Sequence, residues 1–74
     1  MKLVRKVNRV EIGSEYITLE GMLKFVGAVL SGGEAKHAIQ AGEASVNGEP
    51  CFMRGKKLRP GDTVLFDNKL YEIV

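Results

Sequence analysis

The hydrophobic pattern of this chain changes its period at Gly42. Before that glycine, apolar residues between Leu19 and Leu30 recur at the i, i+3, i+4 and i+7 spacing that lines one side of a helix. After it, short apolar runs alternate with turn dipeptides such as Asn47-Gly48, which is typical of paired strands. Helices followed by strands predict an α+β fold, in which two short helices pack on a small antiparallel sheet.

The helical half predicts two helices. The first is expected over residues 18–30, with Thr18 as its N-cap. Ser31 followed three residues later by Glu34 matches a capping box, in which the glutamate reaches back to the amide of the capping residue. A second helix should therefore begin at Ser31, and Gly42 suits the left-handed conformation that ends a helix.

The other half predicts two hairpins, each around a dipeptide that tolerates positive φ. They join residues 44–46 to 51–53 across Asn47-Gly48, and residues 63–66 to 70–74 across Asp67-Asn68. Between the hairpins, residues 54–59 are expected to form a basic loop and residues 60–62 a turn. Residues 1–17 fit neither period, although residues 10–12 suggest an added strand.

The length of the chain favours a surface-binding module. We expect residues 1–74 to form one domain, since 74 residues leave little room for an enclosed active-site cleft. The apolar stretch Phe25–Leu30 is far too short to span a bilayer, and the basic start of the chain lacks the features of a secretory signal. Cys51 is the single cysteine, so no internal disulfide is available. These features predict a cytoplasmic protein with no membrane partner.

The net charge of +2 is small, but the cations are unevenly distributed. Eight of the eleven lysines and arginines fall in two tracts without an acidic residue. They are Lys2, Arg5, Lys6 and Arg9 in the first tract, and Arg54, Lys56, Lys57 and Arg59 in the second. A charge run is often only a solvated loop, yet the density of the second tract favours a polyanion-binding surface.

Catalytic chemistry has little support in the sequence. His37 is the only histidine, and a Cys51–His37 pair is the one nucleophile and base that the chain could offer. A small apolar strand cysteine and a surface helix histidine explain both residues without catalysis. One Cys and one His also cannot supply the four ligands of a zinc site. We predict no enzymatic activity, no metal, no cofactor and no small-molecule substrate.

A helix N-terminus beside basic residues offers a different kind of site. Gly32 and Gly33 lack side chains, so a phosphate could approach the first free amides of the second helix, where the helix dipole favours an anion. The same glycines could instead serve only as a tight corner between helices. Lys36 and Gln40, one turn apart, would extend the surface.

Several motifs together resemble the S4-type RNA-binding domain. They are Leu19, Leu23, Gly27, Ser31, Ala35, Ile39, Gly42, Val46-Asn47-Gly48 and Arg59-Pro60-Gly61-Asp62. The resemblance covers roughly residues 18–66, and the segments Ser-Gly-Gly-Glu-Ala-Lys and Arg-Gly-Lys-Lys-Leu-Arg-Pro-Gly-Asp look like the small stand-alone YaaA-type subfamily of bacteria. It implies an S4-like αL motif, whose helix corner, second helix and nearby loops contact structured RNA.

The resemblance implies RNA contacts for Ser31 and Lys36, and the family hairpin for Asn47-Gly48. The chain departs from the family at two cations, because Gly32 stands where most members have Arg, and Thr18-Leu19-Glu20 replaces the usual Arg-Leu-Asp. The second basic tract is expected to supply replacement charge.

We therefore predict a non-enzymatic protein that binds structured RNA, in particular ribosomal RNA or a ribosomal subunit, in ribosome assembly or translation. The alternative is a protein-interaction adaptor that keeps the fold with weak or no RNA affinity. Recognition should rely on shape and phosphate, since the few aromatic residues predict no exposed set for base stacking. The predicted RNA-binding residues are Ser31, Gly32, Gly33, Lys36, His37, Gln40, Asn47, Arg54, Lys56, Lys57 and Arg59.

Overall fold

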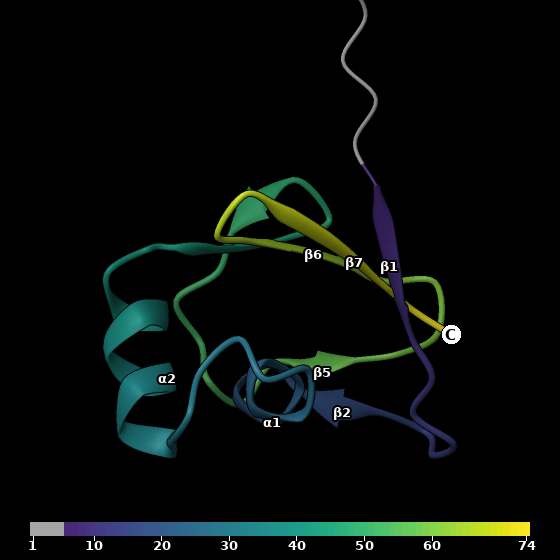
Figure 1. Ribbon diagram of the computed structural model, residues 1–74, viewed down its shortest axis with the longest axis horizontal. Coiled ribbons are helices and arrows are strands. Elements are labelled where there is room, and N and C mark those ends of the chain that lie inside the picture. The colour runs from purple at the N-terminus through teal and green to yellow at the C-terminus, as the bar shows by residue number, and fades with distance from the viewer. Residues whose placement is uncertain (1–5) are drawn as a thin grey trace, which may run out of the picture.

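The computed structural model describes residues 6–74, so Lys2 and Arg5 of the first basic tract lie outside the described residues. Figure 1 shows the order of the elements along the chain. Their bounds are β1 (Val7–Val10), β2 (Ile17–Thr18), α1 (Leu19–Phe25), α2 (Gly32–Gln40), β3 (Ala44–Val46), β4 (Glu49–Pro50), β5 (Lys57–Leu58), β6 (Thr63–Phe66) and β7 (Lys69–Ile73).

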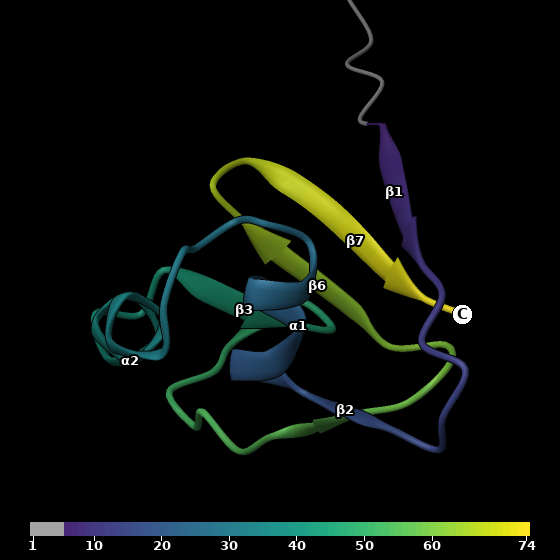
Figure 2. The same cartoon turned by 60° about the horizontal axis from the view of Figure 1, so that its bottom comes forward.

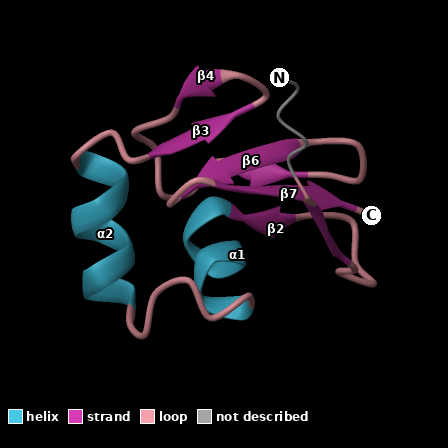
Figure 3. Ribbon diagram, turned by 45° about the horizontal axis from the view of Figure 1, so that its top comes forward, coloured by secondary structure: helices cyan, strands magenta, loops and turns pink. Residues whose placement is uncertain are grey.

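The strands form two sheets. The larger sheet has the order β1-β7-β6-β3-β4, and both helices pack on the same side of it (Figure 3). The smaller sheet pairs β2 with β5 and lies beside α1, away from the larger sheet (Figure 2). The predicted α+β fold, with two helices on a small sheet, is confirmed.

The pairing of β1 adds a feature that the sequence did not predict. β3–β4, β3–β6 and β6–β7 are antiparallel, as expected, but β1 runs parallel to β7 at the edge of the sheet. The added strand covers Val7–Val10, so the predicted range of residues 10–12 is wrong except at Val10. Parallel neighbours need a long connection, and the whole chain between β1 and β7 supplies it.

The core lies between the helices and the larger sheet. The first part of the predicted apolar stripe is confirmed, since α1 buries Leu19, Met22 and Leu23 completely. α2 contributes Ile39 and two small alanines. The remaining buried residues are Val10, Val29, Ala44, Val46, Leu58, Val64, Phe66, Tyr71 and Ile73.

α1 is shorter than predicted. The range of residues 18–30 is wrong beyond Phe25, because Gly27 adopts φ 74° and ends the helix. The amides of this glycine and the next residue donate back to the last turn of α1, which is the Schellman pattern. Val29 is nevertheless buried from the following loop, whereas Leu30 is 89% exposed. Apolar residues thus continue at helical spacing in the sequence after the helix itself has ended.

α2 begins and ends where the sequence predicts. The Oγ of Ser31 accepts a hydrogen bond from the Glu34 amide at 3.1 Å, and Gly42 follows the C-cap with φ 80°. The second contact of the predicted capping box is wrong, because the Glu34 side chain does not bind the amide of the capping residue Ser31. The Glu34 carboxylate accepts from the amide of Leu30 at 3.0 Å, one residue before the cap.

Both hairpin turns are confirmed, and their residues have positive φ. The angles are 51° for Asn47, 87° for Gly48, 51° for Asp67 and 63° for Asn68. The return strand of the first hairpin is β4, Glu49–Pro50, so the predicted range of residues 51–53 is wrong. A two-residue turn places the partner strand directly after it, which leaves residues 51–53 in a loop.

Candidate nucleic-acid interface

The second basic tract is partly a strand, which corrects the prediction of a loop over residues 54–59. Lys57–Leu58 forms β5 and pairs antiparallel with Ile17–Thr18 of β2. Successive side chains of a strand point to opposite faces. Leu58 is accordingly fully buried, while Lys57 and Arg59 on either side of it are exposed. One buried leucine therefore fixes the tract to the core and turns its cations outward.

The backbone of the same tract also caps α1. The amides of Leu19 and Glu20 donate to the carbonyls of Lys56 and Arg54, at 2.9 and 3.1 Å. The first amides of a helix have no partner within the helix, so the tract satisfies groups that would otherwise need another acceptor. This contact holds the basic tract beside the start of α1.

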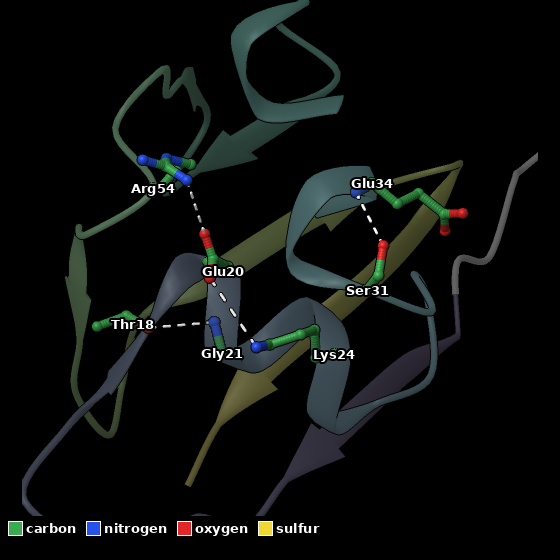
Figure 4. Close-up of polar contacts among 7 residues, drawn as sticks. All are labelled: Thr18, Glu20, Gly21, Lys24, Ser31, Glu34 and Arg54. Carbon is green, nitrogen blue, oxygen red and sulfur yellow. Dashed lines mark hydrogen bonds and ion pairs between the residues drawn. The ribbon is translucent and has the colours of Figure 1, made fainter. Parts of the chain in front are cut away.

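Glu20 lies at the corner between the helices, a position that the sequence analysis did not assign to the site. Its Oε1 is 3.4 Å from the Arg54 guanidinium, and its Oε2 is 3.9 Å from Lys24 Nζ (Figure 4). A Cβ placed on Gly32 would lie 3.4 Å from Glu20 Oε2. The corner therefore carries a carboxylate, and the charge of Arg54 is partly neutralised there.

The two flanks of α2 have different surroundings. Gly32 and Lys36 are four residues apart and share the flank that faces Glu20. His37 instead lines a groove of about 570 Å³ on the other flank. Its other lining residues are Ala28, Val29, Glu34, Ala38, Glu43, Phe66 and Asp67, three of them acidic. Three carboxylates around this groove disfavour a phosphate contact by His37. His37 therefore lies in acidic surroundings, on a different flank of α2 from Lys36.

Asn47 serves mainly to hold the protein together. Its Oδ1 accepts from the Thr63 amide at 2.9 Å, and its Nδ2 donates to Asp62 Oδ1 at 3.0 Å. Asp62 Oδ2 in turn accepts from the Arg59 amide at 2.8 Å. The Arg59 amide and the Asn47 side chain hold the pKa of the Asp62 carboxyl below its ordinary value. This network joins the β3–β4 turn to the end of the basic tract.

Tyr16 is a further residue of this surface that the sequence analysis missed. Lys57 Nζ lies 4.9 Å from the centroid of its ring, and the Arg59 guanidinium lies 6.0 Å from it. Tyr16 is 41% exposed. No local motif marks this tyrosine, because its partners are some 40 residues away and meet it only through the β2–β5 pairing. The sequence analysis expected no exposed set of aromatic residues for base stacking, and it did not foresee this single exposed ring beside two cations.

Other kinds of site find no support in residues 6–74. None of their helices has the length and apolar character to cross a bilayer. No cluster of three or more His, Cys, Asp or Glu side chains in this range is arranged to hold a metal ion. Cys51 is half-buried and packs against the core.

The family model of the S4 domain matches residues 10–74, which include both helices and all strands after β1. The chain belongs to the S4 domain family. The resemblance predicted from the motifs is confirmed. A relative of this S4 protein is the probable ribosome maturation protein RlbA of Bacillus subtilis (strain 168). The two are 44% identical over 57 residues, which cover 77% of this chain and 80% of the relative.

Proposed function

We propose that this S4 protein is a non-enzymatic RNA-binding protein that recognises structured RNA, in particular ribosomal RNA. The observation that carries the proposal is that Lys56, Lys57 and Arg59 are all exposed on a tract that the β2–β5 pairing and the α1 cap hold in one place. Within residues 6–74, none of these three cations takes part in an ion pair. Unpaired cations on a fixed strand are suited to phosphate contacts.

The family and the relative supply the biological context of the proposal. S4 membership favours RNA as the polyanion, and the name of the relative favours a role in ribosome maturation. We expect the protein to act in the cytoplasm on ribosomal RNA or on a ribosomal subunit during assembly or translation. We expect it to work as one domain over residues 1–74, without metal, cofactor or membrane.

The proposed interface runs from the basic tract to α2. Lys56, Lys57 and Arg59 supply phosphate contacts at one end. Lys36 and the Gly32 amide supply contacts at the other, on the α2 flank that faces Glu20. Ser31, Gly33 and Gln40 are exposed and belong to the same proposed surface. His37 lies outside the proposed interface because it lines the acidic groove, and so does Asn47, because its side chain is engaged within the protein.

A double charge reversal tests this proposal. Lys56→Glu with Lys57→Glu should weaken binding to a ribosomal RNA hairpin sharply, and the log–log salt slope should lose about 2 in magnitude, since each phosphate contact contributes about 0.9. Both side chains are exposed, so the melting temperature should change little. Lys36→Ala should reduce the slope by about 1. Filter binding across a salt series measures the affinities and the salt slopes, and thermal unfolding measures the melting temperature.

The matched control is Lys6→Glu with Lys69→Glu. These two lysines are exposed, and each directly precedes the first residue pair of β1 and β7. The starts of these two strands lie far from β5 (Figure 1). The control changes the net charge equally, and it should reduce binding much less than the reversal in the tract. Equal losses would contradict a local interface and leave only general electrostatic attraction.

The adaptor alternative draws on one observation, the Glu20 carboxylate that neutralises the helix corner. A protein that binds RNA only weakly would tolerate this anion. If wild-type protein binds no RNA hairpin even at low salt, the RNA proposal is wrong and the adaptor takes its place.

A further inference from the structure

Tyr16, Lys57 and Arg59 form one cluster on the outer face of the β2–β5 sheet. Ile17 pairs with Leu58, so the antiparallel register places Tyr16 opposite Arg59 and diagonal to Lys57. Opposite and diagonal neighbours of this kind share one face of a sheet. Ile17 and Leu58 take the other face and pack into the core. The pairing therefore sorts the five residues into a core face and an aromatic, cationic outer face.

From this cluster we propose that Tyr16 stacks on an unpaired RNA base, while Lys57 and Arg59 contact the phosphates that flank it. This inference rests on the proposed RNA-binding function and adds that the surface selects an unpaired nucleotide. An aromatic ring stacks on any base, and adjacent cations follow the backbone, which is how proteins bind unstacked nucleotides.

The geometry of the cluster fits this role. Both cations lie within the roughly 6 Å range at which a cation is attracted to an aromatic ring, so the ring and the two charges hold one another in place. The tyrosine remains 41% exposed, which leaves part of its surface open to a ligand. A site that is held in place before binding loses less conformational entropy when the RNA arrives.

The other exposed aromatic residues lack this combination. Phe52 is 59% exposed, but its ring lies against Gly42, where a Cβ would approach it to 3.0 Å. Phe25 is 63% exposed at the end of α1. Among the described residues, neither phenylalanine has a cation over its ring. Tyr16 is thus the aromatic residue that the fold places together with unpaired positive charge.

The test uses a short RNA hairpin with one bulged 2-aminopurine and the same hairpin without the bulge. Wild-type protein should bind the bulged hairpin more tightly and quench the 2-aminopurine fluorescence. Tyr16→Leu should lose about 5- to 150-fold in affinity for the bulged hairpin, the range expected for one stacked base, and keep its affinity for the paired one. Tyr16→Phe retains the ring and should retain the preference and the quenching.

Two results would overturn the inference. One is wild-type binding to the bulged hairpin without quenching. The other is equal binding of the bulged hairpin by Tyr16→Leu and wild type. Both leave RNA binding itself intact. Failure of the wild-type protein to bind either hairpin at low salt would instead overturn the proposed function, and this inference with it. Because quenching is measured on wild-type protein, the test holds even if Tyr16→Leu does not fold.

Discussion

Glu20→Gln should tighten RNA binding. The substitution keeps the shape of the side chain and removes the negative charge that lies at the corner between the helices. Glu20 is 3.4 Å from Arg54 and 3.9 Å from Lys24, so both cations lose their ion pair when the charge is removed. A carboxylate beside Gly32 also repels any phosphate that approaches the start of α2.

The size of the effect follows from the two released cations. An exposed ion pair is worth about 0.2 to 1 kcal/mol, so two new phosphate contacts should tighten binding by about 2- to 30-fold. The log–log salt slope should become steeper by about 1 to 2, since each added contact contributes about 0.9. The lost pairs and the lost charge in the first turn of α1 together should cost about 1 kcal/mol of stability. That cost lowers the melting temperature by about 4 to 8 °C in a domain of this size.

Fluorescence anisotropy with a labelled ribosomal RNA hairpin over a salt series measures the affinity and the slope. Glu43→Gln is the matched control, because it removes the same charge from the acidic groove on the other flank of α2. It should tighten binding only slightly and leave the slope unchanged. If both variants behave alike, the corner has no special role. If Glu20→Gln leaves affinity and slope at their wild-type values, Arg54 and Lys24 do not reach the RNA.

Three further predictions concern stability. Gly42→Ala should destabilise the protein by about 1 to 2 kcal/mol in urea unfolding, because φ is 80° and the new Cβ would lie 3.0 Å from Phe52; a loss below about 0.5 kcal/mol would contradict this. Leu58→Ala should cost about 2 to 5 kcal/mol because Leu58 is fully buried, and an unchanged melting temperature would show that β5 is not part of the core. The Arg59 amide is the main cause of the lowered pKa of Asp62. The ionised Asp62 carboxylate therefore stabilises the folded protein above the unfolded pKa near 3.8, and this stabilisation is lost as pH falls through the lower folded pKa. Asp62→Asn should remove this part of the acid dependence when unfolding is measured from about pH 6 downward.

The parts of the fold that were predictable depend on interactions within a few residues. The cap at Ser31, the end of α2 at Gly42 and the Asn47-Gly48 turn all lie where the sequence analysis expected them. Each depends on a hydrogen bond or a backbone angle that its own residue type favours. The end of α1 was missed although Gly27 marks it, because apolar residues continue at helical spacing to Leu30.

The long-range sheet pairings could not be predicted from local sequence patterns. β1 joins β7 from the opposite end of the chain, and β2 meets β5 across some 40 residues. A two-residue strand such as Lys57–Leu58 has no periodicity to detect, and it is stable only because Leu58 enters a core built by other elements.

The sequence by itself determined the residue types of the candidate site, a helix start with glycines and a dense run of cations. Only the tertiary structure decided how those charges are used. It pairs Arg54 with Glu20, 34 residues away, and leaves Lys57 and Arg59 beside Tyr16. The effect of a charge depends on the distance to its neighbours in space, and long-range strand pairing sets those distances.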